Sequence, residues 1–395
     1  MPKVSIIMPN HNGERYIKDS IQSVLDQTFV DFELIIIDDF SSDNSRQIID
    51  SFSDKRIIKY YSNKNRHVAY TVNIGFAMAT GDYIARIDSD DQWAREKLEK
   101  QVAFMNANIE YGACFTRVHI IDDDGNQTDE KSIYDLFTLE ENKGQKEWLH
   151  YFFENGNCLC NPSVLMRKSA LEQIGKYYNI SYVPAQDFEL WTRMLRKFPI
   201  HILDEKLTYY RWTDSESKIS GNDLSSEIAF FNVHTMIKRN FFNDMTDEEF
   251  INFFGEDFVN YNSKTSLELE IEKAYLLLNS VKSTNMRWLG LEAFEILLHK
   301  EGALELLEKN YNFNLCEYYK LYRNSSLYDT VVKKTLENLE TEKRGLEIKI
   351  KENKEYLDFY KTEIEKINLE LKKILNSSSW RLTEPLRKFI KIFHK

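Results

Sequence analysis

Long apolar runs and paired cysteines are both missing from this sequence. No stretch of about 18 apolar residues, the length that a membrane-spanning helix needs, occurs in the chain. The apolar run behind the first three residues is too short for the core of a signal peptide. The four cysteines show neither C-x-x-C spacing nor the density of a disulfide framework. We therefore expect a protein of the reducing cytoplasm that neither spans a membrane nor is exported by a standard signal.

A surplus of positive charge and a glycine-rich phosphate loop are also absent. The formal net charge is -11, so the chain as a whole does not attract nucleic acid or anionic lipid. Residues 9–13, after the first apolar run, are not the glycine-rich loop that sugar-nucleotide synthesis by nucleotidyl transfer would need. Both function classes are poorly supported, and any basic surface has to be local.

Residues 1 to about 115 alternate short apolar runs with helical patterns, which indicates parallel strands joined by crossover helices. We expect strands at 4–8, 33–37, 56–61 and 83–87. In such a doubly wound α/β sheet, ligands bind at the carboxyl ends of the strands. Each of these runs ends in polar residues, so all four ends can contribute to one crevice.

Three carboxylates follow the last of these runs within four residues: Asp88, Asp90 and Asp91. Acids at a strand tip usually cost stability, so the cluster suggests a cation that brings an anionic ligand of its own. Ligation by oxygen alone favours Mg²⁺ or Mn²⁺, which take one or two carboxylates and complete their shell with phosphates and water. The alternative is that one acid caps the helix expected near Ala94 and the others are solvated.

The rest of the chain changes character three times. Residues 116–220 are less regular, with a hairpin turn expected at 122–126, and complete a first domain at 1–220. Residues 221–328 carry helical spacing and resemble a packing domain without visible chemistry. Heptad spacing follows at 329–376, and a basic tail at 377–395 ends the chain.

The heptads of residues 329–376 predict a coiled coil. Apolar residues recur at the a and d positions, interrupted by Lys343 and Asn353, which can fix register or strand number. We expect homo-oligomerisation through this segment, as a dimer or a trimer. Because the seam is imperfect, a single solvated helix or an intramolecular hairpin is the alternative.

The tail at 377–395 resembles a helix that lies on a membrane surface. Pro385 suits the first helical position, and five basic residues stand out in an otherwise acidic protein. The apolar residues that then share one face are Leu386, Phe389, Ile390 and Phe393. We expect the tail to bind an anionic membrane surface, with docking on the protein itself as the alternative.

Several ordered motifs in the first 220 residues resemble those of the inverting family 2 glycosyltransferases of the GT-A fold. They lie at 4–12, 20–28, 38–43 and 79–91, and together they are far more specific than a lone Asp-x-Asp. The resemblance implies a mixed α/β GT-A sheet with a Rossmann-like nucleotide half and an acceptor half. It also implies transfer of a sugar from a nucleotide-sugar donor, most often a UDP-sugar, with Mn²⁺ or Mg²⁺.

The resemblance also assigns the nucleotide-sugar site residue by residue. The matching positions are Pro9, Asn10, His11, Asp39, Asn65, Asn73 and Asp88. The first three border the nucleotide in the family, and Asp39 matches the acid that recognises uracil or ribose. In the acidic segment one carboxylate binds the metal and another contacts ribose or sugar. The sequence does not assign those roles among Asp88, Asp90 and Asp91.

Asp187 matches the catalytic base of the family, and residues 161–164 resemble its acceptor-side segment. In an inverting transfer the acceptor hydroxyl attacks the anomeric carbon opposite the leaving diphosphate, so a carboxylate must take its proton. Asp187 can also cap the helix that follows, and the two roles are compatible. Glu189 should face another direction on that helix and is the weaker candidate.

One departure from the family concerns the phosphate side. Family members often follow the last core strand with Arg and then His, whereas this chain keeps Arg211 and lacks the His. We carry over Arg211 as a phosphate contact. The alternative is a surface arginine that packs on Trp212.

The function expected from these motifs is a metal-dependent inverting transferase that adds a sugar to a hydroxyl of a growing surface glycan, such as capsule or O-antigen. The coiled coil and tail resemble those of some bacterial glycosyltransferases of surface-polysaccharide assembly, which indicates a lipid-linked acceptor and a peripheral position on the inner face of the cytoplasmic membrane. The alternative is a catalytically inactive GT-A-like scaffold in a polysaccharide-assembly complex. A scaffold would tolerate Asp187→Asn but not deletion of 330–395.

Overall fold

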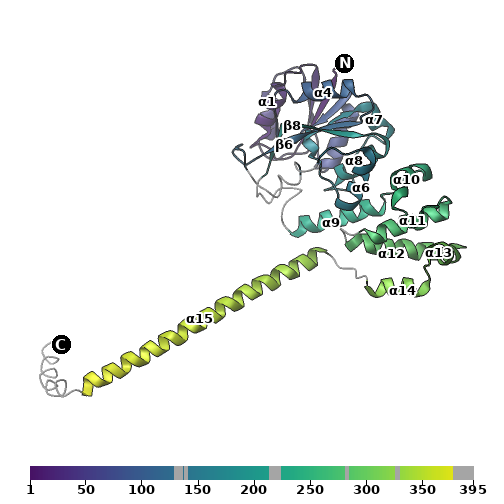
Figure 1. The fold of residues 1–395 in the computed structure, drawn as a ribbon. Coiled ribbons are helices and arrows are strands. Elements are labelled where there is room, and N and C mark those ends of the chain that lie inside the picture. Colours follow the sequence, from purple (N-terminus) through teal and green to yellow (C-terminus); the bar gives the residue numbers. More distant parts are fainter. Residues whose placement is uncertain (129–136, 138–140, 213–223, 281–283, 325–329, 377–395) are drawn as a thin grey trace. The chain divides into compact units, whose positions relative to one another are not determined.

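The computed structural model describes residues 1–128, 137, 141–212, 224–280, 284–324 and 330–376 (Figure 1). The predicted membrane-surface tail at 377–395 lies outside these residues. The chain divides into two compact units, Met1–Tyr328 and Asp329–Lys395. The first unit holds every residue that the motifs single out as catalytic or ligand-binding.

Eight strands form one mixed sheet in the order β3-β2-β1-β4-β7-β6-β8-β5. The strands are β1 (Val4–Asn10), β2 (Phe32–Asp38), β3 (Ile57–Tyr61), β4 (Tyr83–Arg86), β5 (Gln92–Trp93), β6 (Ala113–Ile121), β7 (Leu165–Arg167) and β8 (Ile200–Arg211). Strands β1 to β4 run parallel, β7 is antiparallel to β4 and β6, and β6 runs parallel to β8. The four predicted strands and the doubly wound mixed sheet are confirmed.

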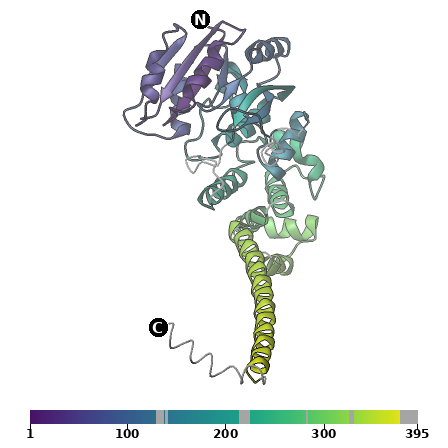
Figure 2. The ribbon, with the colours of Figure 1, turned by 90° about the vertical axis from the view of Figure 1, so that its left-hand side faces the viewer.

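Helices cover both faces of this sheet (Figures 1 and 2). They are α1 (Ile17–Leu25), α2 (Ser45–Ser51), α3 (Val68–Met78), α4 (Lys97–Ala107), α6 (Gln145–Asn155), α7 (Lys168–Gln173) and α8 (Gln186–Lys197). Successive side chains of a strand point to opposite faces, so Ile6 packs with Ile21 of α1 while Ile7 packs in the cluster of Phe76 and Trp191. Two separate hydrophobic layers therefore fix the strand ends at which the motifs lie.

The helical region that follows shares a core with the sheet. Its helices are α9 (Leu224–Arg239), α10 (Asp247–Phe254), α11 (Ser266–Asn279), α12 (Thr284–Leu298), α13 (Ala303–Tyr311) and α14 (Leu315–Asn324). Phe241, Phe250 and Phe254 belong to the same buried cluster as Phe152 of α6 and Phe188 of α8. This packing joins the region to the back of α8 within the first compact unit, and the division expected at residue 220 stays a prediction.

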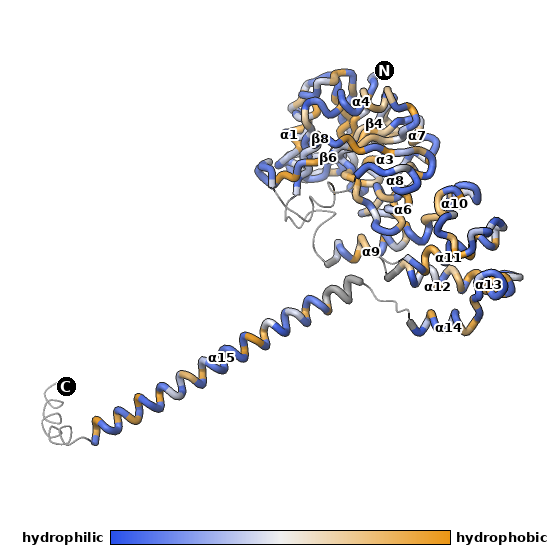
Figure 3. Tube along the Cα trace, in the orientation of Figure 1, coloured by the Kyte–Doolittle hydropathy of each residue, from blue (hydrophilic) through white to orange (hydrophobic). Residues whose placement is uncertain are grey.

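The second unit is dominated by α15 (Thr330–Asn376), a helix of 47 residues. Short hydrophobic stretches recur along it between hydrophilic ones (Figure 3). Within the described ranges, no helix combines the length and apolar character needed to cross a membrane.

Candidate active site

The carboxyl ends of β1 and β2 lie side by side and are joined by a polar network. Asn10 is paired with Asp38 in the strand register, and its Nδ2 donates to Asp38 Oδ2 at 2.9 Å. Arg46 Nε donates to the other carboxylate oxygen at 2.6 Å. Pro9 lies buried within β1 just before this pair. Because Asn10 and Asp38 are both almost fully buried, this network holds the strand ends in place.

Three predicted nucleotide-site residues meet next to this network. His11 Nδ1 lies 2.9 Å from the carbonyl oxygen of Asp39, and Asn65 Nδ2 lies 3.2 Å from His11 Nε2. The tautomer with its proton on Nδ1 satisfies both contacts. The buried Asp39 carboxylate accepts the main-chain N–H of Arg66 at 3.0 Å from each oxygen. His11, Asp39 and Asn65 therefore form one cluster that shapes the loop before α3.

Asn73 lies elsewhere, on α3. Its Nδ2 donates to the carbonyl of Tyr178 at 2.9 Å, and its Oδ1 accepts the Tyr178 N–H at 2.8 Å. The buried Tyr178 hydroxyl donates to Asn161 Oδ1 at 3.1 Å, within the predicted acceptor-side segment. Asn73 thus anchors the loop that leads into α8, and its place in the nucleotide pocket stays a prediction.

The acidic segment begins with an ion pair that the sequence reasoning did not assign. Arg86, the last residue of β4, is buried, and its two terminal nitrogens donate to the oxygens of Asp88 at 2.7 and 3.1 Å. This bidentate pair orients the Asp88 carboxylate at the strand end. A charged residue inside an apolar run was the available signal for Arg86.

Asp187 is the second residue of α8 and lies in its first turn. The N-cap position is occupied by Ala185 instead. Asn157 Nδ2 donates to Asp187 Oδ2 at 3.1 Å. Burial raises the pKa of Asp187 to about 6, although the main-chain N–H of Phe188 and the positive charge of Arg86 act to lower it. The carboxylate is therefore ionised at neutral pH, yet basic enough to take a proton from a hydroxyl in a transition state.

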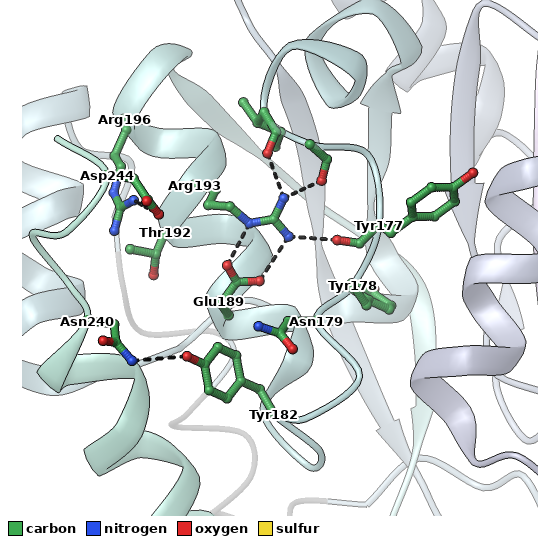
Figure 4. A network of polar contacts seen from close by, with 12 residues as sticks. Tyr177, Tyr178, Asn179, Tyr182, Glu189, Thr192, Arg193, Arg196, Asn240 and Asp244 are labelled. Carbon is green, nitrogen blue, oxygen red and sulfur yellow. Dashed lines mark hydrogen bonds and ion pairs between the residues drawn. The ribbon is translucent and has the colours of Figure 1, made fainter. Parts of the chain in front are cut away.

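Glu189, two residues further along α8, points toward Arg193 of the same helix (Figure 4). Its two oxygens accept from Arg193 at 2.6 and 2.9 Å, and Arg193 also donates to the carbonyl of Tyr177 at 2.8 Å. Glu189 borders a polar cavity of about 220 Å³, which Tyr182 and Arg196 also line. Glu189 is thus clamped by a cation in surroundings separate from those of Asp187.

Arg211 is buried rather than on the surface, so the alternative of a surface arginine is wrong. Its Nε donates to the carbonyl of Asp90 at 2.8 Å, and its main-chain N–H donates to Asp91 Oδ1 at 2.8 Å. Nη1 reaches the carbonyl of Asp123 at 3.1 Å, in the confirmed hairpin turn. Arg211 therefore ties the acidic segment to that hairpin, and its contact with phosphate stays a prediction.

The acidic segment does not form a complete metal cage. Across the described residues, no group of three or more His, Cys, Asp or Glu side chains is arranged to hold a metal ion. Asp88 and Asp90 are partly exposed at the end of β4, whereas Asp91 is buried and accepts the Arg211 main chain. Such a set fits a divalent cation that takes most of its ligands from a bound diphosphate and water.

Together these contacts place a proton acceptor next to a cluster of charges. Arg86 acts electrostatically on both Asp88 and Asp187, so β4 and α8 converge on one site. Sequence reasoning missed Arg86, although its partner Asp88 is only two residues away, and it missed Asn157, whose role comes from a contact across the fold. Asn157 and Asp187 are separated by 30 residues, and no local pattern marks that pairing.

Comparison with known proteins gives consistent matches to one family. The family model described as Glycosyl transferase family 2 matches residues 5–175. TuaG of Bacillus subtilis (strain 168), named provisionally as a teichuronic acid biosynthesis glycosyltransferase, is 32% identical over 241 residues, covering 60% of this chain and 89% of TuaG. WfgD of Escherichia coli, named UDP-Glc:alpha-D-GlcNAc-diphosphoundecaprenol beta-1,3-glucosyltransferase, is 32% identical over 222 residues, covering 55% of this chain and 80% of WfgD.

A solved structure supports the fold. The crystal structure of S. aureus TarS 1-349 in complex with UDP-GlcNAc matches with a TM-score of 0.52 and 19% sequence identity. The match covers 83% of this chain and 93% of that chain. At this identity the likeness concerns the arrangement of the sheet and its helices.

Proposed function

Since this chain belongs to glycosyltransferase family 2, we propose that it transfers a sugar from a UDP-sugar to a hydroxyl of a growing surface glycan, with inversion at the anomeric carbon. The observation that carries this proposal is the position of Asp187, a carboxylate with a pKa of about 6 that shares the buried Arg86 with Asp88. A base at one side and charged groups for a diphosphate at the other are what an inverting transfer needs.

In the proposed reaction the acceptor oxygen bonds to the anomeric carbon while the bond from that carbon to the diphosphate oxygen breaks. The electron pair of the broken bond leaves on UDP, and Asp187 takes the hydroxyl proton. Asn157 holds Oδ2 of Asp187 by a hydrogen bond of 3.1 Å, which helps to fix the direction of the proposed base. General bases of this kind contribute about 10² to 10⁴ in rate.

Mn²⁺ or Mg²⁺ belongs to this proposal because Asp88 and Asp90 are partly exposed carboxylates at a strand end. When bound there, the cation would stabilise the charge that develops on the leaving diphosphate. Arg86 holds the carboxylate of Asp88, and Arg211 holds the main chain that carries Asp90.

The donor and acceptor are proposed from the relatives. The name of WfgD gives UDP-Glc as donor and a diphosphoundecaprenol-linked sugar as acceptor, and that of TuaG points to teichuronic acid. We extend to this chain a UDP-hexose donor and a lipid-linked glycan acceptor. A position on the inner face of the cytoplasmic membrane follows from such an acceptor, and the basic residues of 377–395 would suit an anionic surface.

Release of nucleoside diphosphate tests the proposal. UDP-, GDP- and dTDP-sugars would be incubated with the full chain and a diphosphoundecaprenol-linked acceptor, in Mn²⁺, Mg²⁺ or EDTA. We expect turnover of one UDP-sugar that EDTA abolishes and Asp187→Asn reduces at least 100-fold. The matched control is Glu189→Gln, the same loss of charge on the same helix, which should retain turnover because Arg193 already engages that carboxylate.

The scaffold alternative predicts a different pattern. If the chain only organised other enzymes, Asp187→Asn would leave glycan synthesis in cells unchanged, and no nucleotide would bind in calorimetry. Silence across the donor panel together with absent nucleotide binding would overturn the transferase proposal. Binding of a UDP-sugar without turnover would instead indicate that the acceptor was wrong.

A further inference from the structure

The helix α15 carries an exposed apolar stripe along most of its length. The residues of the stripe are Leu336, Leu339, Leu346, Ile350, Leu357, Tyr360, Ile364, Ile367, Leu371 and Ile374, each between 51% and 67% exposed. They occupy the a and d positions of consecutive heptads. A stripe of this length is costly to leave in water, so it marks a surface for another helix.

We propose that the partner is the same helix of a second copy, running antiparallel, with Leu357 opposite Leu346 of the partner subunit. Two observations favour the antiparallel over the parallel orientation: the charges beside the seam, and the two polar residues within it, Lys343 and Asn353. This inference concerns assembly and stands apart from the proposed reaction.

A parallel pair in register would bring like charges together. Lys343 would meet Lys343 of the partner subunit in the seam, because equal a positions face each other in that arrangement. At the flanking g and e positions, Glu342 would face the partner's Glu347, and Lys349 would face the partner's Lys354. Twofold symmetry repeats both contacts, and no pair of opposite charge offsets them. A parallel trimer has the same flanking pairs.

The antiparallel pair replaces these contacts with attractive ones. With Leu357 opposite the partner's Leu346, Glu347 lies near the partner's Lys354 and Glu340 near the partner's Lys361, each twice by symmetry. One kind of like-charge pair remains, Glu342 with the partner's Glu363, also twice by symmetry. Glu363 forms an ion pair with Lys366 of its own helix at 2.8 Å, which reduces that repulsion. Lys361 forms one with Asp358 at 3.4 Å, which reduces its attraction to the partner's Glu340. The attractive pairs still outnumber the repulsive ones.

The polar seam residues also suit this arrangement. Lys343 lies opposite the partner's Tyr360, so its stem can pack on the ring while the two lysines are far apart. The two Asn353 side chains fall within one helical turn of each other at the twofold axis, where their amides can pair. Polar residues at such positions select one alignment over others at a cost in stability.

The antiparallel pair separates the amino-terminal ends of the two helices by roughly 65 Å, at 1.5 Å per residue. A parallel pair would instead bring these ends together. Orientation therefore decides whether the two connections to residue 328 leave from the same end of the coiled coil or from opposite ends.

Cysteine crosslinking tests the orientation on the full chain. A Cys316→Ser background removes the exposed native thiol, since the other three cysteines are buried. Differently tagged Leu346→Cys and Leu357→Cys variants are mixed, exchanged and oxidised. We expect a disulfide only between the two different variants. Crosslinking of each variant with itself would mean a parallel pair and would overturn the proposal.

A charge reversal gives a second test with opposite signs for the two arrangements. In the antiparallel pair, Glu347→Lys places a lysine opposite the partner's Lys354 at two symmetry-related positions. We therefore expect the affinity of the dimer, measured by ultracentrifugation, to fall by roughly tenfold. In a parallel pair the same change would relieve the Glu342 repulsion and tighten the dimer. The double variant Glu347→Lys/Lys354→Glu should restore the original affinity. A wild-type chain that stays monomeric at tens of micromolar would overturn the proposal outright.

Discussion

The ends of β1 and β2 and the start of α8 both carry carboxylates with little exposure to solvent, but the carboxylates have different partners. Asp38 accepts from Arg46 at 2.6 Å and from Asn10 at 2.9 Å, and Asp39 accepts the Arg66 N–H with both oxygens. Asp187 accepts from one side chain, Asn157, and burial raises its pKa to about 6. At the strand ends the carboxylates hold loops in place, whereas the carboxylate at α8 has the raised pKa that we expect of the proposed base.

We expect the surroundings of a carboxylate, rather than the number of acids nearby, to mark the proposed base. For Asp187 the largest influence is burial, which raises its pKa to about 6. Two residues further along α8, Arg193 holds both oxygens of Glu189. Glu189 is thus engaged in an ion pair and is the weaker candidate.

The largest expected effect is the loss of activity in Asp187→Asn, by 10² to 10⁴ in kcat. Its stability should not fall. A carboxyl group whose pKa is raised on folding stabilises the folded state only while it is protonated. Its contribution to the free energy of unfolding is therefore lost as the pH rises from about 4 through about 6. At pH 7 the neutral amide avoids this cost, and thermal unfolding should occur at the same or a higher temperature than in the wild type.

The counterpart at the strand ends is Asp38→Asn. We expect it to lower the free energy of unfolding by about 1–3 kcal/mol. The amide nitrogen of the new asparagine would face a donor, either Arg46 or Asn10, so one hydrogen bond of the network is lost. A stability loss in Asp187→Asn, or a 100-fold activity loss in a folded Asp38→Asn, would break the comparison.

The next largest effect is expected for Arg86→Met. Removing the cation leaves the partly exposed Asp88 without its bidentate partner, which should cost about 1–3 kcal/mol of stability. The pKa of Asp187 should rise above about 6, because the positive charge of Arg86 acts to lower it. The acidic limb of the pH profile of kcat should therefore move to higher pH. Arg86→Lys keeps the charge and should shift the limb less, whereas equal shifts for both variants would contradict this role.

Half of the sheet was predicted from the sequence. Strands β1 to β4 read as mostly apolar runs, and their observed bounds lie within two residues of the predicted ones. Strands β1, β2 and β4 are buried, whereas β3 at the edge of the sheet is partly exposed.

Strands β5 to β8 were not predicted. The whole of β8 and most of β6 lie in residues 116–220, where the sequence pattern is less regular. Strands β5 and β7 have only two and three residues and show no period, so long-range pairing with β8, β4 and β6 defines them.

The candidate site was predictable only in part. Motifs pointed to Asp88, Asp187 and the cluster of His11, Asp39 and Asn65, because those residues follow strands or open a helix. They could not show that Asn73 anchors Tyr178, a contact between residues 105 apart in the sequence. Roles set by partners across the fold leave no local pattern.

A smaller effect, about tenfold at pH 7, is expected for Asn157→Asp. One oxygen of the new carboxylate can still accept the Leu159 N–H. The other replaces the amide nitrogen that donates to Asp187, so two negative charges then face each other. Repulsion between the two carboxylates should raise the pKa of Asp187, so fewer molecules carry an ionised base at pH 7. Activity should recover as the pH is raised to 8.5. A tenfold loss that persists at high pH would indicate a structural role for Asn157 instead.

The smallest effect is expected for Asp39→Asn, which keeps one acceptor for the Arg66 N–H and so preserves the loop. If this carboxylate recognises the uracil or ribose of the donor, KM for the UDP-sugar should rise several-fold while kcat stays the same, because the lost contact is made equally before and during the reaction. The acidic limb should stay near pH 6, since Asp187 is untouched. Asn65→Ala should likewise raise KM, through the contact with His11 at 3.2 Å. A change in kcat or a shifted limb in Asp39→Asn would show that the strand ends and α8 act together, and the division between loop-fixing and proton-transferring carboxylates would then be wrong.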